Sequence, residues 1–403
     1  MSKRQLQRVV TASTVALLLG ACALGGEGYP SGVDPSIKLA DTSAPVGVVG
    51  NDELPTTLAD GQFVDPYWDA MPRHSSGVFV GFGQISDEAL RISAVTSDGT
   101  ILWTTERPLS CTGFTLTADA DGRALAVLTD MSVGTTTVSV TTASAFDLYT
   151  GELVWGPVEV PGPHTGPGLV FSALPTGGAM GASGPRVALD PTSGSAAISE
   201  DDLDGVLVVG EYDGTLVLAS DDHLVATDAQ SRELWRLPLH ELGLADVQTV
   251  ATSPDVMLGA GFAFVGERDA GYALVDLGDG TVIAHAAQAT ATDPVQQTHI
   301  TVEHDRLRAY TYTGSLLWEQ PIDPKTRIAG TADGVIYLIL DDRIHTRDAV
   351  TGDQVRVYGA AETVALPRNG NVAGAVVLET SQGLLLAIDE AYDGTAAFSQ
   401  PPR

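Results

Sequence analysis

The sequence predicts an all-β protein: a β-propeller of about eight, alternatively seven, four-stranded blades, preceded by a lipoprotein signal peptide and a flexible tether. Three observations lead to the propeller. A short hairpin pattern recurs along the chain at the spacing of one blade, and four of the five tryptophans stand at the same place in that pattern. No stretch shows the apolar stripe of an amphipathic helix three turns long. The recurring hairpins locate the blades, and the missing stripe argues against helical layers.

The hairpin is clearest at residues 146–155, Phe-Asp-Leu-Tyr-Thr-Gly-Glu-Leu-Val-Trp. Asp147 can accept a hydrogen bond from a backbone N–H further round the turn, and Gly151 is free to adopt positive φ at the corner. Leu153 and Trp155 then alternate onto one face of the outgoing strand. The segment therefore predicts two strands joined by a tight turn.

Eight copies of this hairpin follow one another along the chain. Measured at the glycine position, successive copies lie 52, 43, 38, 48, 34, 38 and 42 residues apart. A mean of about 42 residues is the length of a four-stranded propeller blade. The third copy lacks its tryptophan, and the fourth has Arg232 in place of glycine. The residues predicted to form this structural repeat are Asp98, Gly99, Trp103, Asp147, Gly151, Trp155, Asp190, Gly194, Asp228, Trp235, Asp276, Gly280, Gly314, Trp318, Asp348, Gly352, Asp389 and Gly394.

Two regions depart from the regular pattern. Glycines and prolines between 156 and 186 predict a long loop, interpreted as mobile rather than functional, and a degenerate third blade. The first blade lacks an obvious innermost strand, and a propeller hides its edges by pairing its two chain ends in one blade. Residues 62–67 are expected to supply the missing strand, in the same blade as either 77–81 or 396–398. Seven blades are expected if they do not.

The N-terminus predicts export and lipid attachment. Basic residues at 3, 4 and 8 precede an apolar core at 15–19, and Leu-Gly-Ala-Cys occupies 19–22. This order resembles a bacterial lipobox, in which a signal peptidase cuts before the cysteine and the thiol receives a diacylglycerol. An ordinary secretory signal or a short membrane anchor is the alternative. Ala23 and Leu24 follow, so the aspartate that resembles an inner-membrane retention signal is missing.

The lipobox and the repeat together divide the chain into three parts. They are a signal peptide at 1–21, a lipidated N-terminus at Cys22 with a flexible tether to residue 60, and a propeller domain at 61–403. The tether interpretation rests on a Gly-, Pro-, Ser- and Thr-rich composition without periodicity. Pairing of part of this segment onto the propeller is the alternative.

Charge and cysteine content limit the possible partners. The formal net charge is −30 and only three lysines are present, which argues against nucleic acid and against an electrostatic grip on anionic lipid. Cys111 is the one other cysteine, so a lipidated Cys22 leaves no partner for an intramolecular disulfide. Cys111 stands in an apolar context and is interpreted as a buried, inert thiol.

The repeat, Asp-x-x-Thr-Gly-x-x-x-Trp at its fullest, resembles that of quinoprotein-type (PQQ-like) β-propellers over residues 75–399. That superfamily includes PQQ-dependent alcohol dehydrogenases, the non-enzymatic lipoprotein propeller of the outer-membrane β-barrel assembly machinery, and extracellular sensor or binding domains. The resemblance implies tryptophans packed between neighbouring blades. The dehydrogenase members carry adjacent cysteines and a calcium held by acidic and amide side chains. This chain has no Cys-Cys pair and three asparagines.

Two sequence features suggest metal ligands. The acidic turn Glu200, Asp201, Asp202 and Asp204 is a weak calcium candidate, because it lacks the spacing that ends in a coordinating glutamate. His299 and His304 could suggest zinc, but residues at an odd separation on a strand point to opposite faces. No catalytic residue, cofactor or firm metal site is therefore predicted.

The expected function is that of a monomeric, non-catalytic scaffold for an unidentified envelope protein or ligand, held by lipid on the extracytoplasmic side of the cell membrane. The alternative is an envelope enzyme that uses a quinone or metal cofactor on the central propeller face. A third possibility is a ligand-recognition domain that acts for another membrane protein.

Overall fold

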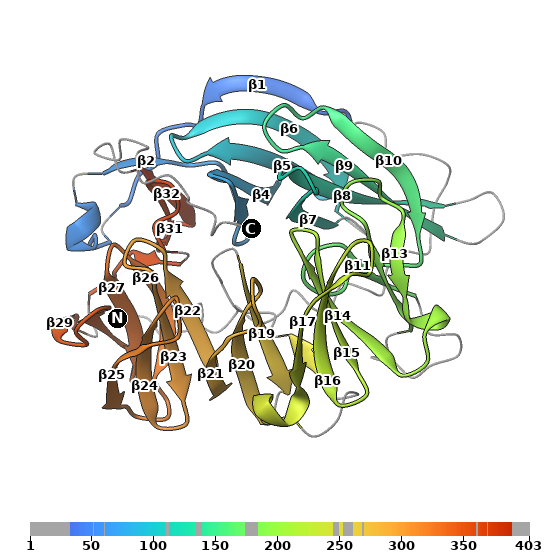
Figure 1. The fold of residues 1–403 in the computed structure, drawn as a ribbon. Helices are drawn as coiled ribbons and strands as arrows, with labels where there is room; N and C mark the ends of the chain where they lie inside the picture. The colour runs from blue at the N-terminus through green and yellow to red at the C-terminus, as the bar shows by residue number, and fades with distance from the viewer. Residues whose placement is uncertain are drawn as a thin grey trace.

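The protein is an eight-bladed β-propeller, as the sequence predicts. The computed structural model describes residues 33–50, 52–59, 61–109, 113–133, 139–173, 184–244, 250–252, 261–267, 270–359, 362–368 and 370–388. Eight antiparallel sheets follow one another around a ring, and the chain passes round it once, so that the first and last blades meet (Figure 1). Short 3-10 helices are the only helices among the described residues: η2 (Thr56–Leu58), η3 (Glu200–Asp202) and η4 (Leu239–Leu242).

The first four blades span the N-terminal half. Within blades 2–4 the chain runs from the innermost strand outward, and blade 1 adds β1 outside β6. Their strands are, for blade 1, β1 (Lys38–Ser43), β3 (Arg73–Ser75), β4 (Val78–Gln84), β5 (Ala89–Thr96) and β6 (Thr100–Pro108); for blade 2, β7 (Gly113–Ala118), β8 (Ala124–Val133), β9 (Ser139–Asp147) and β10 (Leu153–Val160); for blade 3, β11 (Val170–Ser172), β12 (Arg186–Leu189) and β13 (Ala196–Ser199); and for blade 4, β14 (Val206–Tyr212), β15 (Thr215–Ser220), β16 (His223–Asp228) and β17 (Glu233–Pro238).

The last four blades each have four strands, and blade 8 takes one of them from the N-terminal end of the chain. The strands are, for blade 5, β18 (Ala251–Thr252), β19 (Phe262–Glu267), β20 (Gly271–Asp276) and β21 (Val282–Ala287); for blade 6, β22 (Ala289–Asp293), β23 (Thr298–Glu303), β24 (Arg306–Thr311) and β25 (Leu316–Pro321); for blade 7, β26 (Arg327–Ala332), β27 (Val335–Leu340), β28 (Arg343–Asp348) and β29 (Gln354–Val357); and for blade 8, β2 (Gln62–Val64), β30 (Leu366–Pro367), β31 (Ala375–Glu379) and β32 (Leu384–Ile388).

The ring closes through β2, which is the outermost strand of blade 8. Gln62 pairs with Ile388 and Val64 with Leu386. The expectation that residues 62–67 supply a closing strand is therefore confirmed for 62–64, and the placement in the blade of 77–81 is wrong. The innermost strand of blade 1 is β3, and β2 pairs with β32 rather than with 77–81. Residues 396–398 lie outside the described residues.

Residues 33–50 pack on the propeller, which is the alternative to a tether. β1 adds a fifth strand to blade 1 by pairing with β6. Ile37 packs against the core shared by blades 1 and 2, and Ala44, 4% exposed, belongs to the core at the closure. The expected tether to residue 60 is thus corrected for its described part. Residues 22–32 lie outside the described residues.

The third blade is degenerate, as expected, but part of the preceding loop is structured. β11, β12 and β13 make a three-stranded sheet. Inside β11, His164 forms a bridge with Phe171, and the amide of Thr165 donates to the carbonyl of Val170 at 2.8 Å. The loop interpreted as mobile therefore takes the innermost position of blade 3. Residues 174–183 of the same loop lie outside the described residues.

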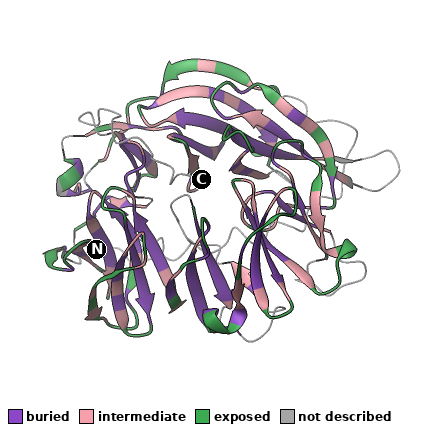
Figure 2. Ribbon diagram, in the orientation of Figure 1, coloured by how far each residue is buried: buried purple, intermediate pink, exposed green. Residues whose placement is uncertain are grey.

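The hydrophobic core lies between neighbouring blades. One cluster joins Val217 and Ala226 of blade 4 to Val265 and Val275 of blade 5, and each is less than 1% exposed. Burial is concentrated on the middle strands, whereas outer strands and turns are exposed (Figure 2). A sheet with two buried faces explains the near-continuous apolar runs of these strands.

Tryptophans dock one blade onto the turn of the next. The indole N–H of Trp103 donates to the carbonyl of Leu148 at 2.9 Å, one residue after Asp147. A Cβ on Gly151, whose φ is +67°, would stand 3.2 Å from the same indole. The same bond recurs from Trp155 to Pro191 (2.7 Å), from Trp235 to Leu277 (2.8 Å) and from Trp318 to Ala349 (3.0 Å).

The turn aspartates cap the backbone of their own turns. Asp147 accepts from the amides of Tyr149 (3.0 Å) and Thr150 (2.8 Å). The fourth turn, which follows a blade without the tryptophan, lacks the glycine. Its positive φ falls on Ser231, and Arg232 takes the place of glycine with its guanidinium 3.0 Å from Asp228. Glycine is needed where an indole lies against the turn.

Candidate functional site

Polar side chains gather on the inner edge of blades 1–4, the edge that borders the axis of the ring. This edge is formed by β3, β7, the segment around His164, and β14 (Figure 1). Thr115 and Thr117 are two residues apart on β7 and so point to the same face. We call the following residues the inner-edge cluster: Arg73, Thr115, Thr117, His164 and Glu211.

Arg73 reaches from blade 1 to blade 2. Its Nη1 donates to Thr115 Oγ1 at 2.9 Å, and its Cζ lies 5.9 Å from the centre of the Phe114 ring. The side chain is exposed to solvent, yet enough protein surrounds it that desolvation lowers the pKa of the guanidinium. A side chain that solvent reaches but protein largely surrounds is expected at the concave inner edge of a ring.

His164 belongs to the same edge, on blade 3. Its Nε2 lies 2.6 Å from the carbonyl oxygen of Gly168, and its ring meets that of Phe171 edge-on at 5.9 Å. Desolvation first, and then the charge of Arg73, lowers the pKa of His164 to about 4. The imidazole is therefore neutral at pH 7, and its Nε2 carries the proton donated to Gly168.

Glu211 joins three blades from a buried position. It is 1% exposed and accepts from Thr117 Oγ1 (2.9 Å), the amide of Leu169 (2.9 Å) and the amide of Gly214 (2.6 Å). Burial raises the pKa of Glu211 to about 7. The three donors occupy both oxygens, so the carboxylate acts as a brace between blades 2, 3 and 4.

Blade 6 holds a second group of buried polar residues. His299 is fully buried between the rings of Phe262 (4.3 Å) and Tyr312 (4.7 Å). Its Nδ1 lies 3.1 Å from Thr292 Oγ1, and desolvation lowers its pKa to about 3. His304 is exposed at a turn. The structure therefore separates the two histidines that could have suggested zinc.

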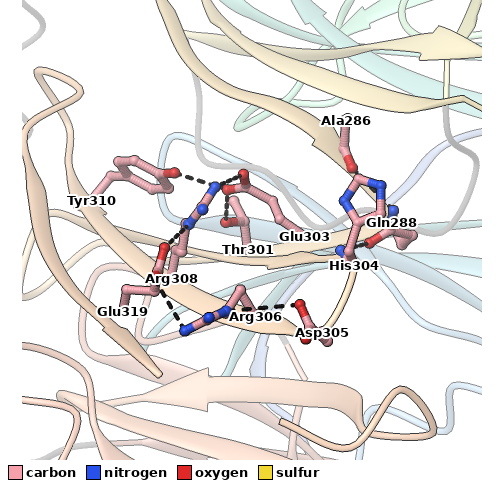
Figure 3. A network of polar contacts seen from close by, with 10 residues as sticks. All are labelled: Ala286, Gln288, Thr301, Glu303, His304, Asp305, Arg306, Arg308, Tyr310 and Glu319. Atoms are coloured by element: carbon pink, nitrogen blue, oxygen red, sulfur yellow. Dashed lines mark hydrogen bonds and ion pairs between the residues drawn. The ribbon is translucent and has the colours of Figure 1, made fainter. Parts of the chain in front are cut away.

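The polar network of Figure 3 also lies on blade 6, around the buried carboxylate of Glu303. Oε1 of Glu303 accepts from Thr301 Oγ1 at 2.7 Å and from the Tyr310 hydroxyl at 2.8 Å. Arg308 pairs with Glu303 and, through Nε at 2.6 Å, with Glu319. Every member has a partner within the network, which fits a structural role for the outer part of this blade.

A groove of about 490 Å³ lies at the closure of the ring. Val46 and Val48 of the N-terminal segment, Asp65 and Tyr67 after β2, and Leu384 of blade 8 are among its lining residues. Val46 is 84% and Tyr67 64% exposed. The groove is thus built by the two ends of the described chain.

The acidic residues singled out as weak calcium candidates are not arranged as ligands. Glu200 uses its two oxygens to accept from the amides of Arg186 (2.8 Å) and Val208 (2.7 Å). Asp201, Asp202 and Asp204 are exposed. Among the described residues, no three His, Cys, Asp or Glu side chains converge on a point where they could hold a metal ion.

The calcium of PQQ-dependent enzymes does not fit at Glu211 on the inner edge. The buried acid there, Glu211, already accepts three hydrogen bonds from the protein, and a calcium ion requires six or more oxygen ligands. No mechanism through such a group is therefore derived.

Several predicted residues lie outside the described part of the chain: Cys22, Cys111, Asp389 and Gly394. Glu211 and Arg73 of the inner-edge cluster are not among the predicted site residues. The sequence held a signal for Glu211, because a charged residue follows directly after the apolar run 206–210. Arg73 had no such signal, because its neighbours in the sequence show no pattern.

In the part of the chain that the structure describes, no helix is long and apolar enough to cross a membrane.

Comparisons with known proteins return similar solved structures. No protein-family model matches the chain, and no curated protein matches it. BamB from Moraxella catarrhalis is 16% identical, with 88% of this chain and 99% of that chain covered and a TM-score of 0.40. The computationally designed Ika8 protein is 13% identical (84% and 100% covered, TM-score 0.39), and AztD from Citrobacter koseri is 15% identical (68% and 92%, TM-score 0.34). Similarity at this level does not say what this chain binds.

Proposed function

We propose that this protein is an extracytoplasmic lipoprotein, anchored to the cell membrane through Cys22, whose propeller is a non-catalytic scaffold for an envelope protein or ligand. The observation that carries the proposal is the order of the N-terminus: a basic start, an apolar core and Leu-Gly-Ala-Cys, followed directly by a propeller.

The short stretch between the cysteine and the propeller limits how far from the membrane such an anchor would let the propeller stand. About eleven residues separate Cys22 from residue 33, where the described chain begins. Even fully extended, such a segment reaches at most roughly 40 Å. A lipid on Cys22 would hold blade 1, which β1 covers, close to the membrane surface.

The buried acids support a binding role over a catalytic one. Asp293 and Glu211 are 0% and 1% exposed, and hydrogen bonds from the protein occupy both carboxylates. A general acid or base needs a free path to the proton it transfers. In this arrangement the carboxylates connect blades and strands.

Chemical cross-linking in intact cells tests this function. The wild-type protein should fractionate with membranes and yield a reproducible set of envelope neighbours, whereas Cys22→Ser should lose both the membrane association and those neighbours. Protein purified from its native host should show no absorption from a quinone and no stoichiometric metal. A bound quinone or metal would favour the envelope enzyme instead.

A further inference from the structure

Arg73 lies at the inner edge of this acidic protein without a carboxylate partner among the described residues. Nine of the fourteen described arginines form an ion pair with a carboxylate, and five do not: Arg73, Arg186, Arg327, Arg343 and Arg347. No described carboxylate pairs with Arg73, whose guanidinium donates a hydrogen bond to the neutral hydroxyl of Thr115. The chain has 51 acidic and 21 basic residues besides histidine, so an unpaired guanidinium at the inner edge needs an explanation.

The guanidinium is placed to receive a ligand. It has five N–H donors, one of which Thr115 takes, and the side chain is exposed to solvent. A second titratable group, His164, lies close enough to Arg73 that the guanidinium charge lowers the pKa of the imidazole. Surrounding protein also displaces much of the water that would solvate the charge. An anion would supply the missing counter-charge.

The surroundings of Arg73 indicate the kind of anion. The ring of Phe114 lies on one side, itself half-buried and in edge-on contact with Phe82 at 6.4 Å. His164 is neutral at pH 7, so the site offers one fixed positive charge. One charge beside an aromatic wall suits a monoanion with an apolar body, and a guanidinium matches the two oxygens of a carboxylate in a bidentate pair.

We propose that the inner edge at Arg73 binds a carboxylate. The guanidinium donates hydrogen bonds to both carboxylate oxygens, and Phe114 lies beside the apolar part of the ligand. This inference deepens the binding role proposed above. The carboxylate comes from a free organic acid or from the C-terminus of a peptide, and these share the same chemistry at Arg73.

Fluorine NMR of 4-fluorobenzoate, titrated with the full-length protein in detergent, tests the site. The signal should broaden and shift with wild type and with Arg343→Gln, a variant of an exposed arginine on blade 7. Arg73→Gln should weaken binding roughly tenfold or more, the loss expected for a hydrogen-bonded charge. The neutral analogue 4-fluorobenzamide should bind none of the three proteins.

Two further experiments identify the source of the carboxylate and control for misfolding of the variants. A short peptide that ends in phenylalanine should compete with 4-fluorobenzoate when its C-terminus is free and fail when it is amidated; failure of both forms assigns the site to small acids. Urea midpoints of both arginine variants should match wild type. If Arg73→Gln unfolds, Arg73→Lys keeps the charge, loses the bidentate geometry and should bind with intermediate affinity.

Equal binding by wild type and Arg73→Gln would overturn the proposal, as would equal binding of the acid and the amide. Neither outcome depends on lipidation or on envelope neighbours, so a failure here is distinguishable from a failure of the proposed function.

Discussion

Replacing Gly151 by alanine tests how one blade docks onto the next. Gly151 has φ +67°, and an added Cβ would lie 2.7 Å from Ile37 Cγ2 and 3.2 Å from Trp103 Cδ1. The left-handed backbone costs about 1–2 kcal/mol for a residue with a Cβ, and overpacking a filled site costs about 1–3 kcal/mol. Gly151→Ala should therefore lower the free energy of unfolding by about 2–5 kcal/mol.

Gly314→Ala is the matched control, because blade 5 carries no tryptophan at the corresponding place. Gly314 has φ +81°, but its added Cβ would meet nothing closer than 3.7 Å. This variant should lose only the backbone contribution, about 1–2 kcal/mol. Urea unfolding followed by tryptophan fluorescence measures both losses.

A double-mutant cycle isolates the collision with the N-terminal segment. Ile37→Ala should be destabilising alone, yet it should recover part of the loss in Gly151→Ala, since the two side chains would compete for one space. If Gly151→Ala and Gly314→Ala are equally destabilising, or if the cycle is additive, the close packing of Ile37 and Trp103 on this turn is refuted.

Four further predictions concern stability and the closure of the ring. Trp235→Ala should cost about 3–5 kcal/mol, and Trp235→Phe about 1–3 kcal/mol for the unsatisfied carbonyl of Leu277, both measured by urea unfolding; a wild-type midpoint in either would contradict the docking role. The pKa of Glu211 rises from 4.5 to about 7 in the fold, so this group's contribution falls as pH rises from about 4.5 to 7, and Glu211→Gln should flatten the thermal stability over that range; an unchanged profile would contradict it. The pKa of His299 falls from 6.5 to about 3, so stability should be lost as pH drops through that window, and less so in His299→Phe; an equal acid loss in the variant would rule this out. Deleting residues 56–72 should open the ring and cause aggregation, because β2 closes blade 8; a deletion variant that stays monomeric with an unchanged melting temperature would show that closure does not need β2.

The repeat predicted the fold because the residues of each hairpin copy specify the local geometry of that hairpin. Asp147, Gly151 and Trp155 specify a turn and an outgoing strand without information from elsewhere in the chain. The exceptions are informative as well. Arg232 replaces glycine in the turn after blade 3, where no indole packs, although Gly314 is kept after blade 5, which also lacks the tryptophan.

Features that join distant segments could not be predicted in the same way. The strand at 62–64 was foreseen, but whether it joins the inside of blade 1 or the outside of blade 8 depends on where the two chain ends meet. Ile37 and Ala44 lie in a short segment that mixes apolar residues with Pro, Ser, Asp and Thr, so its packing on blade 1 left no periodic pattern. The inner-edge cluster draws Arg73 and Glu211 from opposite ends of a 139-residue stretch, and only the ring brings such residues to one edge.

Mass spectrometry of the mature N-terminus tests the central claim most directly. Protein extracted from the membrane fraction of its native host should yield an N-terminal peptide that begins at Cys22 and carries the added mass of a diacylglycerol. Cys22→Ser should yield no lipidated peptide and leave that fraction. An unmodified N-terminus, or cleavage at another residue with full membrane association, would contradict a lipid-anchored propeller.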